Sequence, residues 1–266
     1  MRSPHPTTSP AGPAEIVRTL VSGHLPGLAH VPHCPVPLPV RHVTDSAGRP
    51  LILVRYLSAA ADALWRAGDP TGTPIALAVA DVPPCPDAPG LGRAWASGWG
   101  RPLIGDDARD AAVEFATTRP SGDLLALGRG FVLYRVEVAA VRWEPPAGSA
   151  VEPDPAEYAG AEPDPVHPVE RALVAGLAGH HRGELAAMVH RLAPGAGTCG
   201  RIVTPVRIDR YGMLVDLADP AAPDGVPARR IRVDFPAPLS DPRQFVALLR
   251  PGRRPVAPRP ARRQQT

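Results

Sequence analysis

Apolar and polar positions alternate along the first half of the chain in a way that predicts short β-strands joined by short helices. The clearest strand spans residues 131–143, where Val132 and Val136 point to one face and Arg135 points to the other. Further apolar runs predict strands at residues 35–43, 51–56, 75–82 and 92–104, and helices at residues 14–23, 58–68 and 106–118. Strands separated by helices this short favour a compact antiparallel barrel over a doubly wound sheet.

The second half has a different order of elements. Helical spacing predicts one long helix over residues 168–192, followed by a hairpin over residues 201–217. A strand at residues 229–235 and a helix at residues 241–250 complete the unit. The sequence therefore predicts an α+β protein, with a split β-barrel followed by a small α-β-β-β-α domain that contains an antiparallel sheet.

Composition shifts along the chain give the expected domain boundaries. The acidic, proline-rich stretch between the two halves has no arginine, which is typical of a stiff, solvated linker. We expect a disordered N-terminus at 1–12, a barrel domain at 13–145, a linker at 146–166, a second domain at 167–250 and a basic disordered tail at 251–266.

The charge and cysteine content exclude several classes of protein. All 29 basic residues are arginines and five of them lie in the last 16 residues, so the remaining chain has 24 arginines against 26 acids. That balance leaves no basic surface for nucleic acid. The three cysteines are far apart in the sequence, which argues against a disulfide scaffold and a structural zinc site. No apolar run is long enough to span a membrane, and we expect a cytoplasmic protein.

Several segments, taken in order, resemble a known superfamily. In the first half these are PAEIVRTLV, DSAGRPLILV, IALAVADV, GWGRPL and GFVLYRVEV; in the second they are VERALVAGLAGHHRGEL, VRIDRYGMLV and IRVDFPAPLSDP. They resemble the split barrel of the pyridoxamine-phosphate-oxidase superfamily, most closely the haem-utilisation proteins and the glutamyl-tRNA reductase-binding protein, with their accompanying domain of unknown function. The resemblance covers roughly residues 13–250.

The resemblance implies a homodimer that binds haem or flavin mononucleotide (FMN), or that regulates an enzyme of the tetrapyrrole pathway. Two departures from the family pattern argue against haem degradation. Of a His-x-Asn-x-x-His pattern in many relatives, Gly176 and Ala178 replace the first two members and only His181 remains. The stretch PPAGSA also lacks the histidine that haem-degrading relatives carry after the barrel. We therefore expect a cofactor-binding or regulatory protein, with a flavin- or haem-dependent oxidoreductase or haem-degrading enzyme as the alternative.

Four residues are the candidate cofactor-binding residues. His181 falls on the apolar stripe of the predicted long helix, where it is either a haem or metal ligand or a histidine at a domain interface. Arg41, Arg55 and Ser58 lie along the first strands, where flavin-binding relatives hold the phosphate. The alternative for the two arginines is an ordinary outward-facing strand position.

The barrel region contains further metal-ligating and ring-stacking side chains. The candidate ligands are His24, His30, His33, Cys34 and His42, although their spacing matches no recognised ligand motif. Cys34 and Cys85 each precede a proline, as in haem-sensing motifs, a pairing that chance also explains in a proline-rich chain. Trp95 and Trp99 can stack on a flat ring or serve as core or dimer contacts.

Overall fold

The computed structural model describes residues 10–32, 34–67, 72–221 and 228–250. It divides into two compact units, with the boundary between Pro168 and Val169. His33 and the tail at 251–266 lie outside the described residues, as does most of the N-terminal segment. Each unit is described by itself below.

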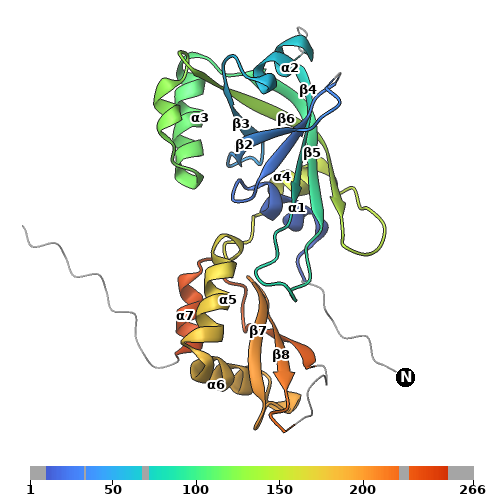
Figure 1. Cartoon of the computed structure of the whole chain (residues 1–266), viewed down its shortest axis with the longest axis vertical. Helices are drawn as coiled ribbons and strands as arrows, with labels where there is room; N and C mark the ends of the chain where they lie inside the picture. Colours follow the sequence, from blue (N-terminus) through green and yellow to red (C-terminus); the bar gives the residue numbers. More distant parts are fainter. Residues whose placement is uncertain (1–9, 33, 68–71, 222–227, 251–266) are drawn as a thin grey trace, which may run out of the picture. The chain divides into compact units, whose positions relative to one another are not determined.

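The first unit is a closed six-stranded barrel, in which the strands follow the order β1-β2-β3-β6-β5-β4 and all neighbours are antiparallel (Figure 1). The strands are β1 (Gly27–His30), β2 (Leu38–Thr44), β3 (Pro50–Arg55), β4 (Thr73–Ala80), β5 (Arg93–Pro102) and β6 (Phe131–Glu144). Five of them match predicted strands. β1 is new, because its four residues, GLAH, are too few to establish a period.

Two helices pack against the interior of the barrel and a third covers part of its outside. Helix α1 (Pro13–Val21) shares a buried cluster with Leu77 of β4, and helix α2 (Ala59–Ala67) shares another with Ile52 of β3. Helix α3 (Gly105–Thr118) packs on the other side of the wall, where its Phe115 is fully buried. A short 3-10 helix, η1 (Gly122–Ala126), leads from α3 towards β6.

The acidic, proline-rich segment after β6 differs from the solvated linker that the sequence predicts. It contains helix α4 (Pro155–Gly160), whose Tyr158 is 1% exposed and donates a hydrogen bond of 2.6 Å to the Gly48 carbonyl. The guanidinium of Arg18 lies over the Tyr158 ring, with its carbon 5.4 Å from the ring centroid, and donates to the Ala161 carbonyl. The segment therefore packs against the barrel as part of the first unit.

The second unit combines a three-stranded antiparallel sheet with helices. Its sheet has the order β7-β8-β9, and the β7–β8 hairpin turns at Asp209, whose carboxylate accepts bonds from the Tyr211 and Gly212 N–H groups. The elements are α5 (Glu170–Gly179), α6 (Arg182–Leu192), β7 (Ile202–Asp209), β8 (Gly212–Ala218), β9 (Arg229–Asp234) and α7 (Arg243–Leu249), with 3-10 turns η2 (His167–Val169) and η3 (Pro194–Ala196). The predicted α+β fold class, a barrel followed by a small antiparallel domain, is confirmed.

One predicted element of this unit is wrong in detail. The sequence predicts a single helix over residues 168–192, whereas the structure has two helices with a break at His180 and His181. His181 precedes α6 with φ −118° and ψ 27°, outside helical geometry. The helical projection that placed His181 on a continuous apolar stripe therefore does not apply.

Candidate functional site

A shallow trough of about 550 Å³ lies on the outer face of the barrel. Its walls come from the end of β1 and from strands β4, β5 and β6, with small side chains on the floor. The lining residues are His30, Val31, Pro32, Cys34, Pro74, Ile75, Ala76, Ser97, Gly98, Trp99, Ala139 and Ala140. Its volume lies in the range of small-molecule and cofactor sites, and its lining is mostly apolar, as such sites require.

A β-bulge shapes the floor of the trough. The pairing of β5 with β6 shifts register between Ser97 and Gly98. At Gly98 the β6 backbone comes so close that an added Cβ would overlap the Glu137 carbonyl oxygen. Bulges re-aim side chains at such positions, and here the residues on both sides of the bulge line the trough.

Two tryptophans four positions apart lie on this outer face. The Trp95 and His30 rings pack together, with centroids 4.9 Å apart and planes tilted by 51°. Trp99 is 43% exposed, although it is a large apolar side chain. A second hollow of about 380 Å³ includes Trp95, Arg142 and Glu144 and shares Ser97 and Ala140 with the first. The two hollows therefore adjoin each other along the outer face of β5 and β6.

Cys34 is a second donor residue among those that line the trough. Its main-chain N–H donates to the Val31 carbonyl at 3.2 Å, which turns the chain back just after β1. The side chain is half-buried, and its Sγ lies 3.2 Å from the Val36 carbonyl oxygen. An imidazole and a thiol in one apolar hollow form a donor set that suits haem iron.

The predicted flavin-phosphate residues, Arg41, Arg55 and Ser58, are not among the residues that line the trough. Arg41, on β2, forms an ion pair with Asp123 and donates a bond of 3.2 Å to the Ser121 hydroxyl. Arg55 is exposed at the end of β3. The Ser58 hydroxyl donates to the Arg55 carbonyl and accepts from the Ala61 N–H, so it caps helix α2.

His181 lies in the second unit beside a small apolar pocket. The pocket has a volume of about 310 Å³ and is lined by His181, Arg250 and residues of α5 and α7. The His181 imidazole lies 3.5 Å from the Glu184 carboxylate, which also accepts a bond of 3.1 Å from Arg250. A main-chain hydrogen bond, the largest cause, lowers the pKa of Glu184, and bonds from Arg250 and His181 lower it further. His181 is thus part of a partly exposed polar cluster with Glu184 and Arg250.

The two histidines near α1 differ in exposure, since His42 is enclosed by the barrel core and His24 lies at the surface. His42 is completely buried, and burial, with a contribution from the charge of Arg119, lowers its pKa to about 4. An added Cβ at Gly27 would overlap the His42 ring, so β1 can approach β2 here only through glycine. Burial also lowers the pKa of His24, with contributions from His167 and Arg119. A neutral, enclosed imidazole such as His42 is a core residue and not an accessible ligand.

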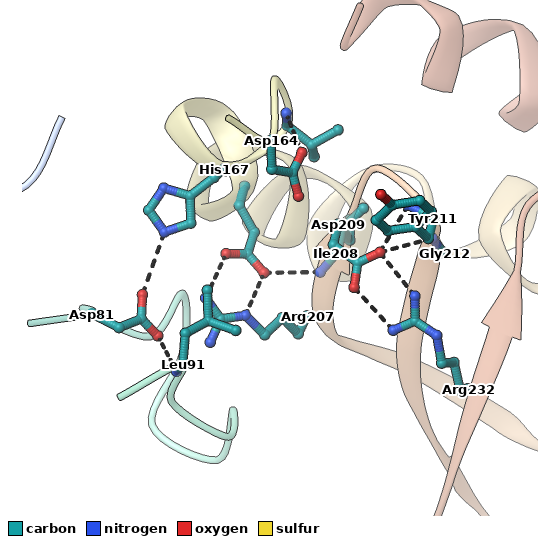
Figure 2. A network of polar contacts seen from close by, with 12 residues as sticks. Asp81, Leu91, Asp164, His167, Arg207, Ile208, Asp209, Tyr211, Gly212 and Arg232 are labelled. Atoms are coloured by element: carbon teal, nitrogen blue, oxygen red, sulfur yellow. Dashed lines mark hydrogen bonds and ion pairs between the residues drawn. The ribbon is translucent and has the colours of Figure 1, made fainter. Parts of the chain in front are cut away.

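Sequence reasoning missed the buried polar contacts of both units, some of which Figure 2 shows. In the first unit, Asp81 accepts from the Leu91 N–H at 2.7 Å and lies 3.3 Å from the His167 ring. In the second unit, Asp209 binds both outer nitrogens of Arg232 at 2.8 and 2.9 Å. Acids and bases far apart in sequence produce no local pattern, so these pairs become visible only in the fold. Their role is to hold turns and strands in place.

Comparison with known proteins supports the fold. No known family model matches the sequence, and a search of the curated proteins finds no match. Among solved structures, the chain is similar to a haem-binding protein from Mycobacterium smegmatis, with 20% identity, a TM-score of 0.63 and coverage of 91% of this chain and 96% of that chain. A protein of unknown function from Agrobacterium tumefaciens is 19% identical over 92% of this chain and 98% of that chain, with a TM-score of 0.40. ChuZ from Campylobacter jejuni is 13% identical over 53% of this chain and 56% of that chain, also with a TM-score of 0.40.

The chain has a split-barrel fold. At 20% identity the likeness to the mycobacterial protein establishes the fold alone, so the haem-utilisation branch remains a prediction. Among the described residues, no helix is long and apolar enough to cross a membrane. Within the same ranges, no group of three or more His, Cys, Asp or Glu side chains is arranged to hold a metal ion.

Proposed function

We propose that this protein binds haem in the trough on the outer face of its barrel and acts as a binding or regulatory module. The observation that carries the proposal is a mostly apolar trough whose lining includes small residues, an exposed Trp99 and two donor residues, His30 and Cys34. A flat, mostly apolar ring matches such a surface, and bound haem would supply an iron centre for the imidazole or thiol. The haem-binding function of the similar mycobacterial protein supports the same proposal.

The apolar lining of the trough suits the porphyrin ring of haem, whose two anionic propionates would face the solvent because the lining offers them no cation. The phosphate of FMN requires cationic or hydroxyl groups, and Arg is the residue best suited to it. No arginine occurs among the described residues that line the hollow at the His30 end. Arg41 is engaged by Asp123 and the Ser58 hydroxyl caps a helix, so both would have to leave their partners to hold a phosphate.

We further propose that two copies of the chain pair through this outer face. Leu28 and Trp99 are 41% and 43% exposed, and the neighbouring Ala139 and Ala140 are also exposed. Exposed apolar residues gathered on one sheet face are typical of an interaction surface. A second copy over the open trough would shield a bound ring from water. A regulatory partner from the tetrapyrrole pathway remains the further expectation from the resemblance.

A titration of the purified full chain tests the proposal. Hemin is expected to produce a saturable change in the Soret band, whereas FMN is expected to leave its own absorbance and fluorescence unchanged. Light scattering is expected to return twice the monomer mass of 28.0 kDa. Saturable FMN binding with no hemin binding would replace the proposal by the flavin alternative.

A further inference from the structure

We propose that the apolar pocket between helices α5 and α7 binds a monocarboxylate with a hydrocarbon chain of about eight carbon atoms. The pocket lies within the second unit, so the proposal does not depend on haem binding by the barrel. Its volume of about 310 Å³ is roughly twice that of a cavity of about 150 Å³, which accommodates one benzene ring. An apolar group of about eight to twelve carbon atoms can therefore enter it.

The walls of the pocket are apolar and come from two helices of the same unit (Figure 1). Helix α5 contributes Leu173 and Leu177, and helix α7 contributes Phe245 and Leu249. Leu177, Phe245 and Leu249 are buried, so they belong to the packed core of the unit. The shape of the pocket is therefore maintained by core packing and not by an exposed loop.

A missing side chain accounts for part of the space. Gly176 lines the pocket, and a Cβ added there would meet no atom within 4 Å outside the backbone of its own helix. The residue lies within α5 and does not have a positive φ. The backbone would therefore accept a larger side chain at this position, and that side chain would fill the hollow.

The polar groups of the pocket lie together. His181 and Arg250 are the polar side chains among the described residues of the lining, and the Nη2 of Arg250 lies 3.4 Å from the Nδ1 of His181. The same Nη2 donates a bond of 3.1 Å to the Glu184 carboxylate. Arg250 and Glu184 are 36% and 37% exposed in this ion pair, and an ion pair so accessible to water contributes little to stability. A ligand carboxylate can therefore take the place of Glu184 at Arg250.

Charge at this end of the pocket favours an anion. Arg182 and Arg191 donate to main-chain carbonyls in the last turns of α5 and α7, and these bonds offset the negative ends of the two helices. Together with Arg250 they supply three positive charges, against the one negative charge of Glu184. The pocket thus combines hydrocarbon walls with a cationic end.

This combination determines the class of ligand. The walls match a hydrocarbon chain, and an arginine binds a carboxylate through two parallel N–H bonds. Octanoate is a suitable probe because its chain length falls within the range that the volume allows. Octan-1-ol has the same chain without the charge, so the two probes separate the contribution of the walls from that of Arg250.

Isothermal titration calorimetry of the full chain with octanoate and with octan-1-ol tests the proposal. We expect octanoate to bind at one saturable site, and octan-1-ol to bind about tenfold more weakly. Arg250→Gln is expected to lower the affinity for octanoate to about that of octan-1-ol, without changing the affinity for octan-1-ol. Glu184→Gln is expected to raise the affinity for octanoate, because it removes the carboxylate that competes for Arg250. A purely structural role of the ion pair would not give opposite effects in these two variants.

Two glycines of α5 provide a matched pair of variants for the walls. A Cβ added at Gly176 or at Gly179 meets no atom within 4 Å outside the helix backbone, but only Gly176 of the two lines the pocket. Both Gly176→Leu and Gly179→Leu place a residue of high helix propensity in the helix, so both variants are expected to fold. Gly176→Leu is expected to abolish the binding of both probes, whereas Gly179→Leu is expected to bind them as the unaltered chain does.

Three results would overturn the proposal. Equal affinities for octanoate and octan-1-ol, or an unchanged octanoate affinity in Arg250→Gln, would exclude the carboxylate site. Unchanged binding in a folded Gly176→Leu variant would place the ligand outside the pocket. The absence of saturable octanoate binding to the unaltered chain would exclude the site altogether. Hemin titration of the same preparations reports on the barrel separately, so failure of this proposal and failure of haem binding are distinguishable.

Discussion

The buried carboxylate of Glu170 accepts a hydrogen bond of 2.9 Å from the Ile208 N–H and lies 3.2 Å from the Nε of Arg207. Glu170 and Arg207 are 3% and 6% exposed, so helix α5 is joined to strand β7 by a desolvated ion pair. Removal of one partner from such a pair takes away the opposite charge that offsets the desolvation of the other. This contact is expected to determine the stability of the second unit.

Glu170→Gln is therefore expected to lower the free energy of unfolding of the second unit by about 3 kcal/mol. Hydrogen exchange of the β7 and β8 amides measures the effect locally, without assuming that the two units unfold together. Asp234→Asn is the control, because its carboxylate is 74% exposed and its partner Arg232 keeps both bonds to Asp209, so its loss is expected to cost less than about 1 kcal/mol. Equal exchange rates in both variants would contradict the prediction.

His42 makes the barrel sensitive to acid. Its pKa is about 4 in the folded protein and 6.5 in an unstructured peptide, so the unfolded chain binds more protons at intermediate pH. The stabilising contribution of the neutral form is fully present above pH 6.5 and is lost as the pH falls towards 4. At pH 5 the loss is about 2 kcal/mol relative to neutral pH. His42→Leu is expected to flatten this part of the stability profile, measured by denaturant unfolding at a series of pH values. An unchanged slope between pH 6.5 and 5 would exclude His42 as its origin.

Trp99 provides a test of the trough that does not depend on the iron ligand. Trp99→Ala removes an exposed aromatic wall, and its effect on hemin affinity is expected to be about tenfold, the equivalent of 1.4 kcal/mol. The same substitution is expected to raise the dissociation constant of the proposed dimer. Trp65→Ala is the matched control, since Trp65 is 83% exposed on helix α2 and does not line the trough. Equal losses of hemin affinity in Trp99→Ala and Trp65→Ala would indicate that haem binds outside the trough.

Tyr158 tests whether the acidic segment belongs to the barrel. Tyr158→Phe removes the hydroxyl that donates to the Gly48 carbonyl and is expected to cost about 1–2 kcal/mol of barrel stability. Burial raises the pKa of Tyr158 to about 12 and also raises the pKa of Tyr134, so spectroscopic titration of Tyr158→Phe is expected to lack the later of these ionisations. Tyr56→Phe, at a 41% exposed tyrosine, is expected to have little effect on stability. If the acidic segment were solvated, as its composition alone suggests, Tyr158→Phe and Tyr56→Phe would have the same barrel stability.

The fold is more predictable than the site because the two depend on different information. Alternating apolar residues, as in β6, identify strands directly from the local sequence. The order of these strands, together with the turns and helix caps between them, predicts a barrel. The Ser58 cap of helix α2 follows from the same local rules. The break at His180–His181 does not, because the apolar spacing continues on both sides of it.

The trough could not be predicted because its walls are far apart in sequence. His30, Trp99 and Ala140 come from three strands, and only the barrel pairing places them around one hollow. Some residues of the trough can be recognised as candidates in the sequence, but they are scattered along it. Trp95 and Trp99 are candidate stacking groups and His30 and Cys34 are candidate ligands, but no pattern in the sequence joins the two pairs. Arg41, Arg55 and Ser58 come from the family resemblance, and their role remains a prediction.

The bond between Tyr158 and Gly48 also affects the order in which the protein can be completed during synthesis. The two residues are separated by 110 positions, and Arg18 reaches still further, to Ala161. All six barrel strands therefore leave the ribosome before the segment that satisfies the Gly48 carbonyl and covers the Arg18 guanidinium. A nascent chain that ends at Glu144 would have a barrel with one unfinished end, and such incomplete states are prone to aggregate. The acidic, proline-rich residues that follow thus complete the packing of the barrel only after all six of its strands have been synthesised.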